Sequence, residues 1–437
     1  MNQAVTQLAN WQVIGAVVIF LVSYAVVITE KMNRAIVALA GAMLMVVLGI
    51  VDWKTAYQQH IEWQTIFLLV GMMFLVGISN KSGIFQYIAI KAAQKAKGEP
   101  IRILLLLSVL SAVGSAFLDN VTTVLLLVPI TFTITRVLKV NPIPYLISEI
   151  LASNIGGTAT LIGNPPNIMI GTATHLGFND FLVNLAPVAI VILAVTLLIL
   201  RKWYGAQLKA DERHKAELMA IDAATFIKSR KLMIKSVIVI GLTLIGFVLH
   251  HAIHVEAAVV AFGGATLLML ISVKEIDVED VFHSVEWVTV FFFAGLFVLV
   301  GGLIDAGIVN KLATMVLEMT GADLAFTSLL ILWLSGIASA TIDNIPYVAT
   351  MIPMIKDLGV QMNVPETALD PVWWSLALGA CLGGNGTLIG ASANLIAAGM
   401  AGKEGKPLSF VAYLKVGVPI TLLSLVISTL YVSFILL

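Results

Sequence analysis

The chain has 437 residues, of which 59% are hydrophobic and only 11% are charged, with 25 basic and 25 acidic residues. Soluble domains carry about 25% charged residues, so this composition indicates an integral membrane protein that crosses the bilayer many times. The zero net charge gives no reason to expect a nucleic-acid partner. The single cysteine, Cys381, excludes a disulfide within the chain and a site built from several thiolates.

Apolar segments of the first half predict membrane spans. The expected spans are 12–29, 34–51, 65–80, an interrupted one at 143–175, and 181–200. The first run lacks a basic start and a small-residue cleavage site, so we expect no cleavable signal peptide. Another apolar stretch, 101–137, carries Asp119-Asn120 near its middle. It is either two crossings or a re-entrant hairpin, and a polar tip favours the hairpin because lipid cannot satisfy polar groups.

The second half follows a basic linker, 201–233. Nine Lys or Arg lie within 201–235, so the positive-inside rule places this segment in the cytoplasm. A second stretch with a polar centre, 324–358, carries Asp343-Asn344 and is expected to form the second hairpin. The expected spans are 234–250, 256–273, 287–303, an interrupted one at 372–399, and 412–436.

The two halves repeat one sequence pattern. An offset of 224 residues aligns Asp119-Asn120 with Asp343-Asn344, and an offset of 227 aligns Asn167 with Asn394. Upstream, an offset of 223 aligns 35–42 with 258–265. Interrupted hydrophobic segments at matching places in two halves are typical of a transporter's binding site. We therefore predict an all-α polytopic membrane protein made of two repeats, 1–200 and 234–437.

Each predicted repeat has five net crossings, and an odd number inverts one repeat relative to the other. Counting from a cytoplasmic 201–235 places both termini outside the membrane. Only Lys54, Lys311 and Lys356 then lie outside, and the other twenty-two basic residues lie inside. Two crossings in place of each hairpin would leave this count unchanged, so the charges support the orientation and not the hairpins. In a bacterium, the location would be the plasma (inner) membrane.

The polar segments provide the candidate binding residues. Paired glycines and prolines disfavour a continuous helix, so 143–175 and 372–399 should each form two half-helices. Half-helix N-termini suit an anion or a polar oxygen, whereas unwound carbonyls and side-chain oxygens suit a hard cation. The predicted substrate- and ion-binding residues are Asp119, Asn120, Thr123, Asn154, Gly157, Thr158, Asn164, Pro165, Asn167, Asp343, Asn344, Asn385, Thr387, Ser392 and Asn394.

The two predicted sites are chemically unequal. The first repeat has Asn164-Pro165-Pro166 where the second has Ala391-Ser392-Ala393. One site is therefore expected to hold mainly substrate and the other mainly the coupling ion. A bound sodium ion would take oxygens from Asp119, Asn120, Asp343 and Asn344, and we expect no other cofactor.

Asp119, Asp343 and Glu149 are acids in apolar surroundings. Intramembrane acids cost about 2.5–3.5 kcal/mol on insertion scales and usually serve a function, so these three are candidates for proton coupling. The competing interpretation is that each aspartate only caps the half-helix that follows it. Glu149 aligns with Leu376 and has no acidic counterpart, which leaves its role open.

With these motifs in view, the chain resembles the ion transporter superfamily, and within it the group of arsenite permeases, NhaD-type antiporters and melanosomal P proteins, with a citrate-transporter-like domain. The resemblance covers nearly the whole chain. Its motifs are Phe117–Thr123, Asn154–Thr160, Ile162–Asn167, Ile342–Pro346 and Gly379–Asn394. It implies a homodimer with a scaffold and a moving transport domain, hairpins that open to opposite sides, and elevator-type alternating access. Dicarboxylate and citrate carriers of the superfamily have Ser-Asn-Thr tips, so the aspartates here favour cation or proton handling.

These observations predict a proton- or sodium-coupled secondary transporter of a small inorganic ion, embedded in membrane lipid and not an enzyme. Sodium–proton antiport and arsenite or antimonite efflux both remain open. A sodium-coupled carrier of citrate-like acids or chloride is an alternative, weakened because neither polar segment contains an arginine. An uncoupled channel is disfavoured by the titratable tips. An intramembrane aspartyl enzyme is disfavoured because no nucleophile–base set is apparent.

Overall fold

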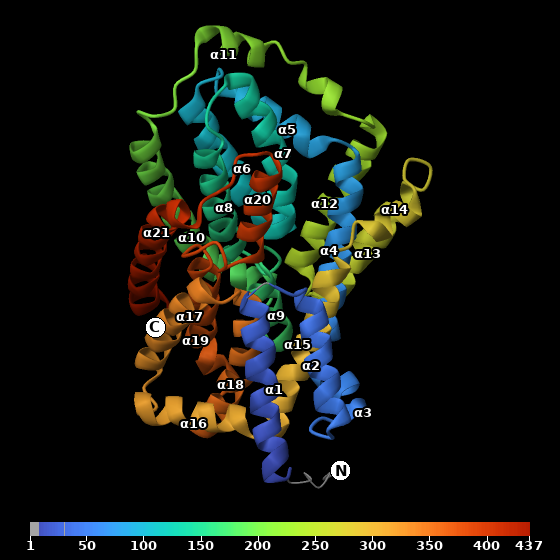
Figure 1. The fold of residues 1–437 in the computed structure, drawn as a ribbon. Helices are drawn as coiled ribbons and strands as arrows, with labels where there is room; N and C mark the ends of the chain where they lie inside the picture. The colour runs from blue at the N-terminus through green and yellow to red at the C-terminus, as the bar shows by residue number, and fades with distance from the viewer. Residues whose placement is uncertain (1–7, 30) are drawn as a thin grey trace.

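Every regular element of the described residues, 8–29 and 31–437, is helical in the computed structural model (Figure 1). The first half contains α1 (Asn10–Thr29), α2 (Arg34–Val47), α3 (Trp53–Thr55), η1 (Ala56–His60), α4 (Trp63–Lys81), α5 (Ile84–Lys95), α6 (Pro100–Leu118), α7 (Asn120–Leu138), α8 (Ile143–Thr158), α9 (Pro165–Ala173) and α10 (Phe178–Tyr204). The linker contains α11 (Glu212–Met219) and η2 (Ala223–Phe226). The second half contains α12 (Arg230–Leu249), α13 (Ala257–Ile271), α14 (Val278–His283), α15 (Trp287–Asp305), α16 (Ile308–Thr320), α17 (Leu324–Thr341), α18 (Asn344–Met362), η3 (Glu366–Leu369), α19 (Asp370–Gly383), α20 (Ser392–Lys403), α21 (Phe410–Tyr431) and η4 (Val432–Leu436).

The helices recur in the same order in both halves. The helical pair α6 and α7 matches α17 and α18, and the pair α8 and α9 matches α19 and α20. Two helices that the apolar pattern did not predict, α5 and α16, also correspond. Each follows a glycine with positive φ, Gly83 (φ 82°) and Gly307 (φ 70°), a backbone conformation that favours glycine.

The two halves pack against each other across matched helices. In one contact α4 lies against α13, and in the other α2 lies against α15. A Cβ atom on Gly71 would lie 2.8 Å from the backbone N of Phe262, and one on Gly295 would lie 2.7 Å from the backbone C of Ala38. The helix backbones therefore approach at the same position of the repeat in both halves, as small residues permit in membrane bundles.

Nine helices of the described residues are long and apolar enough to cross a membrane. The helices α2 and α13 are shorter than the sequence predicted, with 14 and 15 residues. At 1.5 Å per residue they extend about 21–23 Å, which is less than the ~30 Å hydrocarbon core. A turn at Gly49 (φ 66°) ends the first of them early, so 34–51 does not form one full-length spanning helix.

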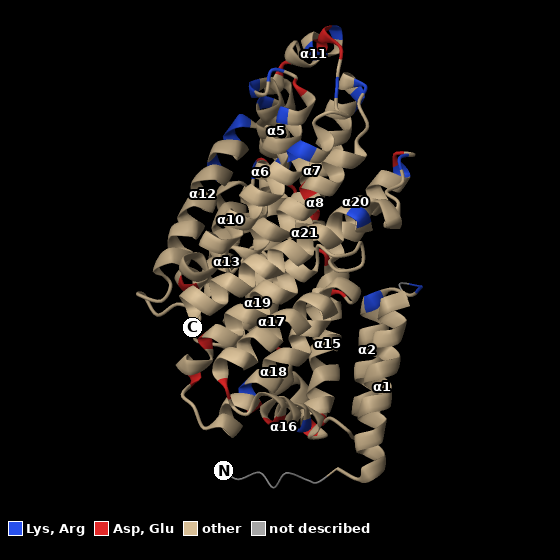
Figure 2. Cartoon of the chain, turned by 90° about the vertical axis from the view of Figure 1, so that its left-hand side faces the viewer, with Lys and Arg blue, Asp and Glu red and all other residues tan. Residues whose placement is uncertain are grey.

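Basic side chains gather at one end of the molecule. Figure 2 shows Lys and Arg concentrated around α11 and the neighbouring helix ends, whereas the middle of the bundle is almost entirely uncharged. The first half of the linker lies across this end. Its Lys215 pairs with Glu99 at 2.7 Å, and the amide of Gln94 donates to the Ile221 carbonyl at 2.7 Å.

Candidate functional site

Two aspartates lie at the turns of the helical hairpins. Asp119 separates α6 from α7, and Asp343 directly precedes α18. We call Asp119-Asn120 the first tip and Asp343-Asn344 the second tip. Figure 1 shows the α6–α7 hairpin in the upper half of the molecule and the α17–α18 hairpin in the lower half. Each aspartate accepts a backbone N–H of its own helix, so the capping role considered from the sequence is present at both tips.

At the first tip the carboxylate is satisfied by a single neighbour. Asp119 has φ 80° and is 7% exposed. Its Oδ1 accepts the Thr122 backbone N–H at 2.8 Å, and its Oδ2 accepts the Thr122 hydroxyl at 2.6 Å. The Thr123 hydroxyl donates to the Asp119 carbonyl at 2.7 Å. The Asp119 carboxylate is therefore held by contacts within its own turn.

At the second tip the carboxylate reaches other elements. Asp343 Oδ1 accepts the Ile345 backbone N–H at 3.0 Å, and Oδ2 accepts the hydroxyl of Ser392, at the start of α20, at 2.6 Å. Arg34, at the start of α2, donates to Ser392 Oγ at 2.5 Å and lies 3.4 Å from Asp343 Oδ2. The second tip is therefore tied to both a broken helix and α2.

Arg34 is a site residue that the sequence analysis missed. Besides the second tip it donates to the Thr289 hydroxyl at 3.0 Å, and its guanidinium lies 5.1 Å from the centre of the Phe292 ring. No arginine occurs within the polar segments themselves, but the fold brings this one to Asp343 across 309 residues of sequence. The argument against an anion carrier from the lack of arginine was therefore wrong for the second site.

Asparagines of both halves meet in the interior, where the broken helices cross. Asn154 on α8 donates to Asn385 Oδ1 at 2.9 Å and to Asn394 Oδ1 at 3.0 Å. Asn120 of the first tip donates to Asn154 Oδ1 at 2.9 Å, and Asn385 donates to the Leu151 carbonyl at 3.3 Å. The structure thus joins the first tip to both broken helices through one buried amide network.

A related contact joins the two broken helices at Cys381 on α19. Cys381, the counterpart of Asn154, donates its thiol to Asn167 Oδ1 at 3.4 Å. The Asn167 amide donates to carbonyls of the unwound segment, including Thr160 at 2.8 Å. The Asn394 amide likewise donates to Gly384 at 2.7 Å. Each broken helix is therefore closed by an asparagine that satisfies its unwound carbonyls.

Four further residues predicted from the sequence lie at the breaks in the two interrupted helices. Thr158 donates to the Asn154 carbonyl at 2.8 Å, and Thr387 donates to the Ala340 carbonyl at 2.7 Å. A Cβ atom on Gly157 would lie 2.4 Å from the Gly163 carbonyl oxygen, so only glycine allows the unwound chain to approach there. Pro165 is the first residue of α9 and is buried, a position where its missing N–H costs nothing.

Buried amide atoms without a partner lie at both tips and at one break. Asn164, which is fully buried, has no hydrogen-bond partner for either side-chain polar atom among the described residues. Asn120 Oδ1 and Asn344 Nδ2 are also buried and unpartnered within this part of the chain. Leaving such groups unsatisfied costs about 1–3 kcal/mol each, so these atoms indicate contacts with a ligand or water.

Glu149 lies apart from the tips. Its Oε1 accepts the Thr131 hydroxyl at 2.5 Å, and Oε2 has no partner among the described residues. Thr131 is twelve residues along α7 from Asp119, which corresponds to about 18 Å of helix. The structure therefore places the Glu149 carboxylate away from the first tip.

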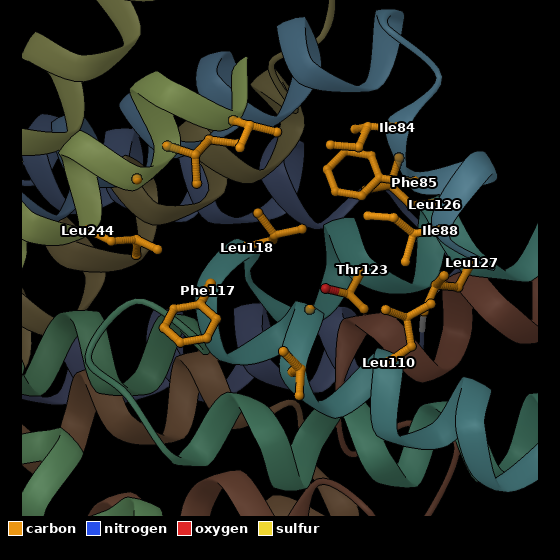
Figure 3. Close-up of a pocket in the computed structure, with 15 residues that line it drawn as sticks. Ile84, Phe85, Ile88, Leu110, Phe117, Leu118, Thr123, Leu126, Leu127 and Leu244 are labelled. Carbon is orange, nitrogen blue, oxygen red and sulfur yellow. The ribbon is translucent and has the colours of Figure 1, made fainter. Parts of the chain in front are cut away.

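An apolar cavity of about 350 Å³ borders the first tip (Figure 3). It lies between the α6–α7 hairpin and α12, with Phe117, Leu118 and Leu244 among its walls and Thr123 as a polar group beside it. A Cβ atom on Gly241 of α12 would meet no other atom within 4 Å. The first tip thus faces α12 across an apolar gap, unlike the second tip with its arginine.

No cluster of three or more His, Cys, Asp or Glu side chains suited to a metal ion occurs in residues 8–29 and 31–437.

Comparison with known families and relatives gives one consistent result. The model of the citrate transporter family matches residues 24–379. An uncharacterized transporter of Mycobacterium tuberculosis is 41% identical over 419 residues, which cover 95% of this chain and 97% of that protein. The mouse P protein is 33% identical over 500 residues, which cover 96% of this chain and 60% of that protein. These matches confirm the resemblance read from the tip and break motifs.

A solved structure shares the fold. The crystal structure of the Alcanivorax borkumensis YdaH transporter aligns with a TM-score of 0.61, covering 90% of this chain and 88% of that chain. The sequence identity is 14%, so this likeness concerns the architecture alone.

Proposed function

The chain is a membrane transporter of the citrate transporter family, and from this premise we propose that it moves a small inorganic ion in exchange or together with protons or sodium. Sodium–proton antiport and arsenite or antimonite efflux are the two forms of this proposal. The observation that carries it is the pairing, at each tip, of a capping aspartate with a buried asparagine that has an unpartnered amide atom.

The arrangement of the hairpins supports a mechanism of alternating access. Their positions in opposite halves of the molecule (Figure 1) and the matched order of the helices support two repeats, 1–200 and 234–437, that are inverted in the membrane. The hairpins would then be re-entrant from opposite sides, and the unit of hairpins and broken helices would move past α1, α2, α12 and α13 as an elevator. The resemblance implies that the transporter is a homodimer. The basic residues around α11 support a cytoplasmic position of the linker, which would place both termini outside the membrane.

Coupling would take place on the tip aspartates. A carboxylate in a desolvated site holds a proton more firmly, and a bound cation competes with that proton. Asp343 and Asp119 would each pass through this exchange, with Asn120 and Asn344 supplying further polar contacts to the ion. Asn154, Thr158, Asn164, Thr387 and Asn394 would line the path between the tips.

Arg34 supports a second candidate function, a sodium-coupled anion carrier. Its guanidinium lies beside Ser392 at the N-terminus of α20, and both favour negative charge. In the structure Asp343 already occupies this position. An anion could bind there when the aspartate is protonated or displaced, and citrate-like acids or chloride would then be the substrate.

Proton flux in proteoliposomes, read with an internal pH dye, tests the proposal. Sodium, lithium, arsenite, chloride and citrate are added in turn to the wild type and to Asp119→Asn and Asp343→Asn. Asparagine caps a helix nearly as well as aspartate, so both variants should fold. We expect one ion to trigger proton movement that is lost in both variants.

Asp323→Asn is the matched control, because Asp323 also caps a helix, accepting the Phe326 N–H at 2.7 Å, but is exposed. It should transport like the wild type. Sodium-dependent uptake of citrate or chloride that persists in both tip variants, without proton movement, would reject carboxylate coupling in favour of the anion carrier. Flux that follows voltage alone, with no ion gradient driving another, would indicate a channel.

A further inference from the structure

A polar cavity lies away from the tips, at the opposite end of the first hairpin. It has a volume of about 440 Å³ and is formed by the C-terminal end of α7 and the connection between α20 and α21. Three of its lining residues are basic: Arg136, Lys139 and Lys406. We call it the basic cavity. None of its residues belongs to the proposed transport site.

The basic cavity has more positive than negative charge. Its one acidic lining residue, Glu404, pairs with Arg136 at 2.7 Å, joining the end of α7 to the end of α20. Lys139 and Lys406 form no ion pair among the described residues. Both lysines are exposed, and an anion bound in the cavity would be attracted to each of them.

Arg136, Lys139 and Asn141 follow one another at the end of α7 and are all exposed where they line the cavity. Lys139 caps α7 with φ 52°, which turns the chain back after the last helical residue. The next residues, Asn141 and Pro142, also line the cavity. Asn141 Oδ1 accepts the Ile143 N–H at 3.1 Å, so its amide group remains available to donate. The cavity thus offers a guanidinium, two ammonium groups and an amide, which together match the oxygens of a phosphate group.

The position of the cavity indicates the source of that phosphate. The helix α7 also packs against α11 of the basic linker, so the cavity lies at the end of the molecule where basic residues gather. Under the proposed orientation this is the cytoplasmic side, where the membrane leaflet carries anionic headgroups. Basic pockets between membrane helices on this side are suited to such headgroups.

We propose that the basic cavity binds the phosphate-containing headgroup of an anionic membrane lipid. The bound headgroup would neutralise Lys139 and Lys406 and hold the base of the first hairpin against the end of α20. If these segments move together during transport, the lipid would stabilise the position in which they lie nearest the inner surface. The proposal rests on the orientation given under the proposed function, but the cavity contains none of the residues proposed for ion coupling, so the two are tested separately.

The test measures lipid binding to the purified full-length chain by native mass spectrometry, with phosphatidylglycerol and phosphatidylcholine compared at equal concentration. Phosphatidylglycerol should bind more tightly to the wild type. Each basic residue near a charged surface is worth about 1 kcal/mol, so Lys139→Gln with Lys406→Gln should weaken phosphatidylglycerol binding by about 25-fold. Glu404→Gln removes the one acidic group and should strengthen it.

The matched control is Lys91→Gln with Lys95→Gln, which removes two exposed charges from α5 at the same end of the molecule. It should leave the affinity within twofold of the wild type, because these charges are outside the cavity. An equal loss in this control, or equal binding of the two lipids, would reject the site as general surface attraction. Inorganic phosphate serves as the second probe: if it displaces phosphatidylglycerol at millimolar concentration, the source is free phosphate and the lipid proposal is wrong.

Discussion

The two hairpin tips occupy equivalent positions in the repeat but are held in different ways. At the first tip, Thr122 supplies both donors to Asp119, and the facing side of α12 is an apolar cavity. At the second tip, Asp343 is held by Ser392 and Arg34, which come from two other elements. The carboxylate of Asp119 is thus held within its own turn, whereas the carboxylate of Asp343 is held by two other elements.

Two exchanges between the repeats account for this difference. Thr122 corresponds to Pro346, which has neither a hydroxyl nor an N–H, so Asp343 Oδ2 lacks a partner within its own turn. Pro165 corresponds to Ser392, which supplies the missing hydroxyl from the broken helix. The comparison teaches that a duplicated site can keep its aspartate and still change which part of the molecule that aspartate restrains.

The largest expected effect comes from removing the ion pair between Arg34 and Asp343 at the second tip. Arg34→Ala leaves a partly buried Asp343 without its cation, which should cost about 1–3 kcal/mol of stability and abolish coupled transport. Thermal unfolding and proteoliposome flux measure the two effects. Arg102→Ala, at an exposed position on α6, is the control and should change neither. Full transport by Arg34→Ala would show that the contact between Arg34 and Asp343 has no part in the transport cycle.

The next effect, on stability alone, is expected at the first tip. Thr122→Val keeps the backbone N–H but removes the hydroxyl from Asp119 Oδ2, at a cost of about 1–3 kcal/mol. Ser392→Ala removes the equivalent hydroxyl at the second tip, where Arg34 still faces Asp343 Oδ2. Thermal unfolding should therefore show a larger loss for Thr122→Val than for Ser392→Ala. The reverse order would mean that the Asp119 carboxylate has partners beyond its own turn.

A further contact of the second tip should contribute less. The Tyr24 hydroxyl on α1 donates to the Pro346 carbonyl at 2.5 Å. Tyr24→Phe removes this hydrogen bond and should cost about 0.5–1.5 kcal/mol in thermal unfolding. Tyr57→Phe, on an exposed residue of η1, provides the comparison and should be neutral. Equal thermal stability of the two variants would show that the contact from Tyr24 on α1 does not stabilise the second tip.

The smallest effect is expected from filling the gap at the first tip. The Cβ position of Gly241 has open space around it, so Gly241→Leu should place its side chain in the apolar cavity of Figure 3. Gly263→Leu on α13 has similarly open space and gains the same helix propensity. Both should change stability by less than about 1 kcal/mol. A marked destabilisation by Gly241→Leu alone would show that the first tip packs directly against α12.

The sequence predicted the helices and their interruptions better than it predicted contacts across the fold. Long apolar runs and paired glycines or prolines place α8, α9, α19 and α20 within a few residues, because these signals are local. Arg34 could not be assigned to the second tip, since at the start of α2 it has the same appearance as any basic residue near a span. Glu149 was recognisable as an acid in an apolar helix, but only packing shows that it faces Thr131 rather than the tips.

Amphipathic helices were the other omission. The segments α5 and α16 contain enough polar residues to fall below the level expected of a membrane span, and neither was predicted. The glycines at which they begin, Gly83 and Gly307, were visible as a matched pair in the repeat. Reading those glycines as positive-φ helix starts would have located both helices.

The burial of Cys381 has a practical consequence for spectroscopy. It is the one cysteine of the sequence, is fully buried, and has its thiol directed at Asn167. A thiol-reactive label should therefore leave the folded wild-type protein unmodified. Pairs of cysteines introduced at exposed positions on α1 and α16 would then be the labelled sites, so the distance between these two helices becomes measurable in lipid without first replacing the native cysteine.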